Sequence, residues 1–100
     1  MERGGCVYII TNKIHSVLYT GVTSNLIDRI QKHIDRYYEN SFSAWYKVNK
    51  LVYYCSYDSI TDAITEEKRI KAGSRKSKIK LIEGMNPQWQ DLWVSEVSKW

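Results

Sequence analysis

The sequence predicts a single mixed α/β domain spanning residues 1–100, and three features support that prediction. Two runs rich in β-branched and aromatic residues, 7–12 and 17–23, flank a short connection, which is typical of a β-hairpin. A third run of the same kind covers 51–57. Elsewhere apolar residues recur at helical spacing, which predicts about four helices. A chain of 100 residues suffices for one domain with a modest core.

The predicted hairpin places two tyrosines on one face of the sheet. A connection with an even number of residues puts Tyr8 and Tyr19 on the same side, because side chains alternate along a strand. That side also carries Cys6, Ile10, Val17 and Gly21. The other side is more apolar, and we expect the core there; it carries Val7, Ile9, Leu18, Thr20 and Val22.

The first predicted helix begins after a Thr-Ser-Asn run that ends at Asn25 and supplies an N-cap. The helix runs to about residue 38. Arg29 and His33 are spaced i and i+4 on one flank of its apolar stripe, so both should lie at the boundary between core and solvent. Residues 39–49 form a polar and aromatic connection with room for a short helix.

Two further helices follow the third strand. The pattern predicts one over 60–72, with Ser59 as its N-cap and Gly73 at its end. A short basic helix over about 75–83 comes next, and Gly84 with the Asn-Pro pair after it should break that helix. The remaining tail should fold back onto the domain, and it carries Trp89, Leu92, Trp93 and Trp100.

A carboxylate interrupts the apolar stripe of the 60–72 helix. Glu67 lies three residues after Ile64 and three before Ile70, in the middle of the stripe. Burying an unpaired carboxylate is costly or forces it to take up a proton, so Glu67 needs a partner. The pattern leaves two partners open: a cation such as Arg29, or a hard metal ion such as Mg²⁺ that carboxylates and water hold together.

The polar groups expected on the tyrosine side of the sheet form a candidate phosphate site. An arginine makes forked contacts with phosphate oxygens, a tyrosine or histidine passes a proton to or from water, and a carboxylate holds a metal that polarises the phosphoryl group. Each residue alone also has a structural interpretation as a core aromatic or an ion pair. We expect five residues to converge on this one face: Tyr8, Tyr19, Arg29, His33 and Glu67.

The positive charge is concentrated in one segment of the chain. The net charge is +4, yet residues 68–80 contain seven basic residues and no acid, so the rest of the chain is mildly acidic. Such a block suggests a polyanionic partner, although a solvated helix face gives the same pattern. Its members are Lys68, Arg69, Lys71, Arg75, Lys76, Lys78 and Lys80.

Composition narrows the class of protein further. No apolar run reaches the length of a membrane span, and the first residues lack a signal-peptide layout, so we expect a cytoplasmic protein that does not enter a membrane. Cys6 and Cys55 are expected to be buried thiols in a reducing compartment. No Cys or His spacing suggests zinc, and no obligate protein partner is evident.

Taken together, these motifs resemble the GIY-YIG nuclease domain. VYI is followed eleven residues later by YTG, then by an arginine, a histidine one turn later and a helix with EEKRIK. The sequence is similar to the small stand-alone bacterial branch of that family, which is related to the nuclease domains of excision-repair enzymes and of homing endonucleases. The similar stretches are VYIITNK, VLYTGVTSNLIDRIQKH, KLVYYCSYDSITDAITEEKRIKAG, RKSKIKLIEGMNP and WQDLW.

The resemblance implies a small three-stranded antiparallel sheet flanked by helices, an α+β fold. It implies that Tyr8 and Tyr19 are the motif tyrosines, Arg29 the phosphate-binding arginine and His33 its accompanying histidine. It further implies that Glu67 is the single metal ligand, for Mg²⁺ or Mn²⁺. By the same resemblance, a late asparagine supports the site, and Asn86 stands at its position.

The chain departs from the family pattern in two ways. Cys6-Val7 and Thr20 replace backbone or packing residues of the tyrosine motifs. Many members also place a lysine near the tyrosine that activates water, whereas the hairpin positions here hold Leu18 and Val22. The general base therefore stays open among Tyr8, Tyr19 and His33.

Three hypotheses for function follow. The first is a metal-dependent endonuclease that cleaves phosphodiester bonds in DNA, with repair or recombination as its process. The second is a nucleic-acid-binding module of the same fold with little or no catalysis, and the third is a protein-interaction domain that uses exposed tryptophans.

Overall fold

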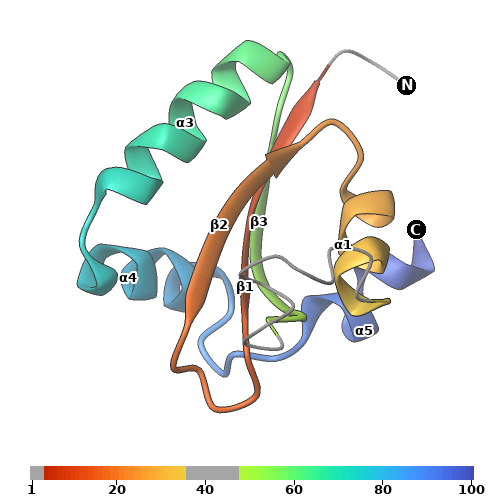
Figure 1. Cartoon of the computed structure of the whole chain (residues 1–100), viewed down its shortest axis with the longest axis vertical. Helices are drawn as coiled ribbons and strands as arrows, with labels where there is room; N and C mark the ends of the chain where they lie inside the picture. Colours follow the sequence, from red (N-terminus) through yellow and green to blue (C-terminus); the bar gives the residue numbers. More distant parts are fainter. Residues whose placement is uncertain (1–3, 36–47) are drawn as a thin grey trace.

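The computed structural model describes residues 4–35 and 48–100. Three strands form one antiparallel sheet in the order β2-β1-β3. Helices α1 and α5 cover one face of the sheet, and α3 and α4 cover the other (Figure 1). The elements are β1 (Gly5–Thr11), β2 (Leu18–Thr23), α1 (Leu26–Ile34), β3 (Lys50–Tyr57), α3 (Ile60–Ala72), α4 (Arg75–Met85), α5 (Leu92–Ser95) and a 3-10 turn, η1 (Val97–Lys99). This arrangement confirms the predicted three-stranded antiparallel fold.

The register of the hairpin confirms the predicted tyrosine face. Tyr8 pairs with Gly21, and Ile10 pairs with Tyr19, in the β1–β2 ladder. Both tyrosines pack in the apolar cluster beneath α1, together with Cys6 and Ile10. The alternation of side chains along the two strands therefore predicted correctly which face of the hairpin carries the tyrosines.

The core differs from the expectation, because both faces of the sheet are buried. Every residue of β1 is buried. One cluster joins Tyr8 and Ile10 to Ile30 of α1, and the other joins Val7 and Ile9 to Ala63, Ile70 and Ile82 of α3 and α4. The middle strand of a sheet with helices on both faces has no solvent side, so the tyrosine face is core as well.

An irregularity in β3 shifts its pairing with β1. Ile9 lies opposite Tyr53 and Ile10 opposite Leu51, which leaves Val52 as the extra residue of a β-bulge. Val52 is fully buried with the α3–α4 cluster. The backbone groups of a bulged residue lose their ladder partners, so its carbonyl oxygen needs another donor.

The helix boundaries agree with the local signals, with two exceptions. Side chains of Asn25 and Ser59 cap α1 and α3, each accepting a backbone N–H at 3.1 Å, and Gly73 ends α3 as predicted. The basic helix ends at the Asn86-Pro87 pair, as predicted, but Gly84 does not break it. Helix α4 continues through it to Met85, because an exposed glycine in a helix costs only about 1 kcal/mol. Helix α1 ends at Ile34, with Asp35 as its C-cap, which is earlier than the predicted end near residue 38. Residues 36–47 lie outside the described residues.

The C-terminal tail folds back onto the sheet, as predicted. Leu92 and Val97 are buried in the cluster beneath α1, and Trp93 packs against it. Cys6 and Cys55 are free; Cys6 is buried and Cys55 is half-buried. None of the described helices combines the length and the apolar character that a membrane crossing requires.

Candidate functional site

A cluster of two phenols and an imidazole lies on the α1 face of the sheet. The hydroxyl of Tyr8 lies 3.3 Å from Nε2 of His33, a contact between β1 and α1. The His33 ring meets both tyrosine rings edge-on, with centroids 6.0 Å from Tyr8 and 5.8 Å from Tyr19. The structure therefore brings together three of the predicted site residues.

A glycine makes room for this cluster. Gly21 lies opposite Tyr8 in the ladder. A Cβ at Gly21 would overlap with Cζ and the hydroxyl oxygen of Tyr8. The phenol therefore lies across β2, where only a residue without a side chain leaves space.

His33 is held in its neutral form. Burial and, to a smaller extent, the positive charge of Arg29 lower the pKa of His33 to about 4. Arg29 lies one turn before His33 on α1, as the i, i+4 spacing predicted. A neutral imidazole offers one donor and one acceptor nitrogen. At neutral pH the neutral His33 ring can therefore share a hydrogen bond with the Tyr8 hydroxyl.

The residues of this cluster differ in how much of their surface solvent can reach. Tyr8 is fully buried and His33 is 8% exposed. Tyr19 and Arg29 are half-buried, so they have surface that a ligand can reach. In this conformation Tyr19 is the tyrosine that a solvent-borne ligand can contact.

Glu67 does not lie on the tyrosine face, and this corrects the expectation of one shared face. It is 7% exposed on α3, between Ala63 and Ile70, which pack against the opposite face. Its Oε2 lies 3.0 Å from Nζ of Lys71, one turn later. Sequence reasoning named Arg29 as the candidate cation and missed Lys71, although i, i+4 spacing is a signal for such a pair.

Lys71 links the two faces around the edge strand β2. The pKa of Lys71 is raised, first by its hydrogen bond to Glu67 and to a smaller extent by the charges of Glu67 and Tyr19. Lys71 is therefore within electrostatic reach of Tyr19, which projects from β2 on the other face. β2 is an edge strand, and α1 and α3 flank it from opposite sides (Figure 1). The charges of Glu67 and of ionised Tyr19 thus both act on Lys71.

Asn86 is placed in a structural contact at the end of α4. Its Nδ2 donates to the carbonyl oxygens of Val52 at 3.2 Å and Gln90 at 2.8 Å. Its Oδ1 accepts from the backbone N–H of Gln90 at 2.9 Å. Asn86 thereby supplies the donor that the bulged carbonyl needs. These three bonds join α4, β3 and the following turn.

The basic segment is divided between side chains that bond to other groups of the protein and side chains that do not. Arg69 forms an ion pair with Glu66, and Lys71 with Glu67. The guanidinium of Arg75 donates to two carbonyls of the β1–β2 connection. Three exposed lysines remain directed to solvent without a recorded side-chain bond in the described part of the chain: Lys68, Lys76 and Lys80.

The residues around Glu67 fit a loosely held hard cation. Within residues 4–35 and 48–100, no three His, Cys, Asp or Glu side chains gather as a metal site would. Glu67 is a buried carboxylate that already holds a cationic group. Mg²⁺ commonly takes one or two carboxylates and completes its shell with water and phosphate oxygens.

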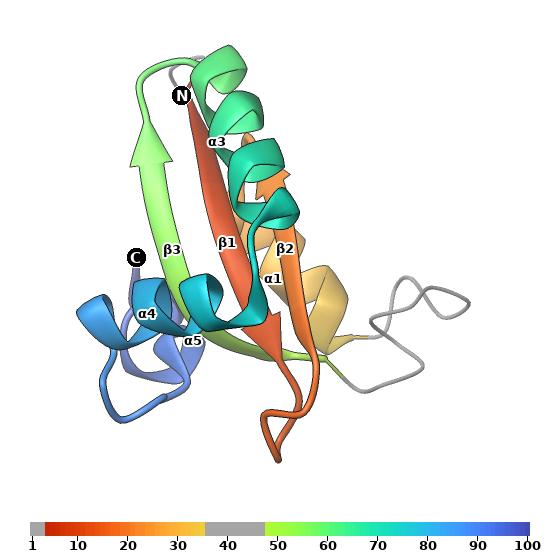
Figure 2. The same ribbon diagram turned by 90° about the vertical axis from the view of Figure 1, so that its left-hand side faces the viewer.

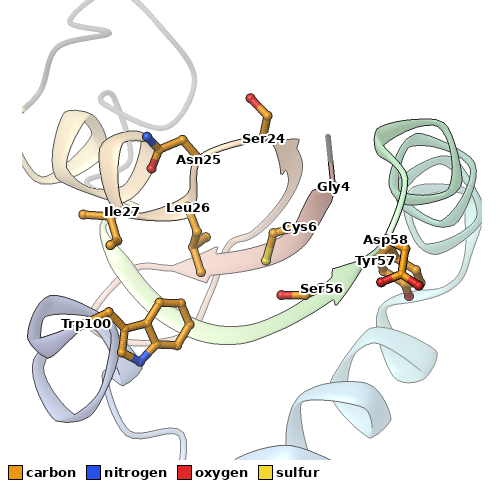
Figure 3. A pocket seen from close by; sticks show the side chains of 11 residues that line it. Gly4, Cys6, Ser24, Asn25, Leu26, Ile27, Ser56, Tyr57, Asp58 and Trp100 are labelled. Carbon is orange, nitrogen blue, oxygen red and sulfur yellow. The ribbon is translucent and has the colours of Figure 1, made fainter. Parts of the chain in front are cut away.

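A separate cavity of about 530 Å³ lies away from this site (Figure 3). It opens between the start of α1 and the end of β3, with Trp100 across it (Figure 3). Leu26, Cys6 and Ser56 contribute to its lining, and none of the described residues that line it is a lysine or an arginine. None of the predicted site residues lines it.

The sequence and the fold both match known proteins. Residues 4–80 match the model of the GIY-YIG catalytic domain, which is a nuclease-type domain. The chain is 35% identical over 71 residues to a UPF0213 protein of Syntrophus aciditrophicus, covering 71% of this chain and 80% of that protein. It is 29% identical over 79 residues to a UPF0213 protein of Pediococcus pentosaceus, covering 79% and 82%.

A solved structure shows the same fold. The solution NMR structure of a UPF0213 protein from Bacillus halodurans superposes with a TM-score of 0.56 at 26% identity, covering 88% of this chain and 92% of that one. The chain therefore belongs to the GIY-YIG family and, within it, to the small bacterial UPF0213 proteins.

Proposed function

We propose that this protein is a metal-dependent endonuclease that hydrolyses phosphodiester bonds in DNA. Its membership in the GIY-YIG family supports a nuclease-type activity. The observation that carries the proposal is the position of Tyr19, which contacts His33 on one face of the sheet and lies within electrostatic reach of Lys71, the partner of Glu67. The proposed site would thus take a phenol and an imidazole from one face of the sheet and a carboxylate from the other.

The exposure of each side chain suggests its role in the proposed reaction. Arg29 is half-buried beside the cluster and would bind the scissile phosphate through its forked donors. Tyr19, also half-buried, would act as a phenolate that takes the proton of the attacking water as a new P–O bond forms. The bond to the leaving oxygen breaks, and that oxygen takes a proton from solvent water. Tyr8 and neutral His33 lie behind Tyr19, where their hydrogen bond and ring contacts would orient the Tyr19 phenol.

Glu67 would hold Mg²⁺ or Mn²⁺, which would stabilise the negative charge that develops on the phosphate. Lys71 must then share or leave the carboxylate that it contacts. The exposed lysines would bind the DNA backbone, so affinity should fall steeply with salt and carry little sequence preference. Those lysines are Lys68, Lys76 and Lys80. Repair or recombination remains the process that this activity would serve.

A cleavage assay with a matched pair of carboxylate variants tests the proposal. Plasmid and single-stranded DNA are incubated with Mg²⁺ or Mn²⁺ and wild type, Glu67→Gln or Glu66→Gln. We expect Glu67→Gln to lose at least about a hundredfold in rate, whereas Glu66→Gln, whose carboxylate pairs with Arg69, keeps most of it. Intact DNA with wild type under all conditions, or undiminished cleavage by Glu67→Gln, would contradict the proposal.

The second candidate is a nucleic-acid-binding module without catalysis. Two observations favour it: Lys71 already neutralises Glu67, and Tyr8 is fully buried. This function predicts binding that weakens with salt while the DNA stays intact. It also predicts that Mg²⁺ and Mn²⁺ leave the melting temperature unchanged, since a ligand raises it only by binding the folded state.

A further inference from the structure

The connection between β1 and β2 is held rigid by its own hydrogen bonds. Oδ1 of Asn12 accepts from the backbone N–H groups of Ser16 at 2.8 Å and Val17 at 3.2 Å. Nδ2 of Asn12 donates to the hydroxyl of Ser16 at 2.7 Å, and the Thr11 hydroxyl donates to the carbonyl of Val17 at 2.7 Å. These bonds fix both arms of the loop relative to the strands.

Distant parts of the chain brace the same loop from outside. Arg75, at the start of α4, donates to the carbonyls of His15 at 2.7 Å and Ser16 at 3.2 Å. The His15 ring stacks on Trp89 with centroids 4.6 Å apart and 25° between the planes. Nζ of Lys50 lies 2.9 Å from Nε2 of His15. Three separate elements therefore hold one turn in place.

The backbone is bent to make these contacts. His15 has φ of 59° and Trp89 has φ of 54°, and they are the non-glycine residues with positive φ among those described. This conformation is uncommon for bulky side chains and costs free energy. The two residues that adopt it stack on each other, so the fold maintains the turn in one orientation at a cost.

What this braced turn presents is an exposed apolar side chain. Ile14, between Lys13 and His15, is 78% exposed. The turn projects beyond α4 and α5 at the bottom of both ribbon views (Figures 1 and 2). Lys13 is exposed beside it, and the guanidinium of Arg75 lies at its base. A rigid apolar tip among cations is complementary to the stacked bases and phosphates of a nucleic acid.

We propose that Ile14 is a wedge that inserts between adjacent bases of the bound DNA. This inference rests on the proposed function and adds the class of substrate. Apolar wedges of this kind partly unstack a base step, and the unstacking costs a few kcal/mol. DNA that is already unstacked, at a bulge, gap or branch, avoids much of that cost. The protein therefore prefers discontinuous duplexes to continuous ones.

The spacing along β2 predicts where cleavage falls. Tyr19 follows Ile14 by five residues, which at roughly 3.3 Å per residue gives about 17 Å at most. At roughly 3.4 Å per base step this distance is at most about five steps. Cuts should therefore cluster within about that many nucleotides of the discontinuity.

Unstacking can be measured separately from cleavage. A duplex with a one-nucleotide bulge carries 2-aminopurine beside the bulge, and it is titrated with wild-type protein in EDTA so that the DNA stays intact. We expect a severalfold rise in 2-aminopurine fluorescence with wild type and with Ile14→Leu. We expect no rise with Ile14→Ser, whose affinity falls about fivefold. Arg75→Lys keeps the charge but loses the forked contact, so it should also lose most of the rise.

The outcomes separate this inference from the proposed function. If neither the wild-type protein nor any variant bound DNA, both the wedge and the proposed nuclease function would be overturned. Binding without a fluorescence rise, or the same rise with Ile14→Ser as with wild type, would overturn the wedge and leave the nuclease proposal standing. Because the Ile14 side chain is exposed, Ile14→Ser and Ile14→Leu should keep the wild-type melting temperature, which is measured alongside.

Discussion

Gly21 lies directly opposite Tyr8 in the β1–β2 ladder, and the absence of a side chain there lets the Tyr8 ring cross β2 to reach His33. We expect Gly21→Ala to destabilise the protein by about 3 kcal/mol, because its Cβ would overlap with a fully buried phenol that has no space to move. Urea unfolding measures the loss as a lower midpoint at an unchanged slope.

Gly84 provides the matched control. It lies in α4 without positive φ, and a Cβ added to it would meet no other atom within 4 Å. Gly84→Ala should therefore stabilise the protein by about 0.5–1 kcal/mol through helix propensity. Equal effects of the two substitutions would mean that Tyr8 and Gly21 do not meet as described.

The protonation of His33 should make folding stability depend on pH. Its pKa is about 4 in the folded protein, lowered by burial and then by Arg29, against about 6.5 when unfolded. Between these values the unfolded chain binds a proton that the folded protein excludes, so stability is complete above pH 6.5 and falls as the pH drops to 4. The loss should be about 3 kcal/mol, measured by urea unfolding across this range.

The variant His33→Gln separates the effect of His33 on the pH dependence of stability from the effects of titrating carboxylates. His33→Gln cannot titrate, so the difference in unfolding free energy between wild type and His33→Gln should shrink as the pH falls from 6.5 to 4. A difference that stays constant with pH would show that His33 titrates normally in the folded protein.

Local signals predicted the elements of this fold well. The hairpin register follows from alternation in β1 and β2, and the caps of α1 and α3 fall at Asn25 and Ser59, as their residue types indicate. Strand register in a hairpin and helix caps depend on residues that are close in sequence, so local sequence patterns can predict them.

The sequence patterns did not predict which face of the sheet each helix covers. A stripe on α3 shows that Glu67 faces a sheet, but not which side of it, because that choice depends on the path of the chain after β3. The partners of Arg75 lie 59 and 60 residues away in the β1–β2 connection, and no local pattern predicts them. The bulge at Val52, which gives Asn86 its partner, is likewise a property of the assembled sheet.

The contacts of Asn86 predict a structural role that stability measurements can test. Asn86→Asp replaces the donor to two carbonyls with an acceptor, so we expect a loss of about 3 kcal/mol from repulsion and unsatisfied groups. Asn49, which is exposed, supplies the control, and Asn49→Asp should change stability by less than about 0.5 kcal/mol. Thermal unfolding compares the two.

Activity then decides whether Asn86 also supports the site. At a temperature where Asn86→Ala remains folded, a structural role predicts DNA cleavage within about threefold of wild type, a difference of under 1 kcal/mol in barrier. A large loss of cleavage in a fully folded variant would instead place Asn86 in the catalytic machinery.

The pair of Lys71 and Glu67 predicts a competition between an ammonium group and a metal ion. Nζ of Lys71 lies 3.0 Å from the buried carboxylate, yet the lysine side chain is 57% exposed and Glu67 only 10%. An exposed partner of this kind contributes at most about 1 kcal/mol and can swing into solvent at low cost. A cation bound at Glu67 would have to displace it.

We therefore expect Lys71→Met to bind Mn²⁺ up to about fivefold more tightly than wild type, since the competing charge is gone. Lys68→Met is the control, because it removes the same charge from an exposed position on the same helix. It measures the general electrostatic effect on Mn²⁺ affinity. That effect should be smaller than the gain in Lys71→Met and should vanish at high salt. Titration followed by the paramagnetic resonance of free Mn²⁺ gives both affinities. Equal gains in the two variants would show that Lys71 does not compete at the carboxylate, and a weaker affinity in Lys71→Met would mean that the lysine instead holds Glu67 in position for the metal.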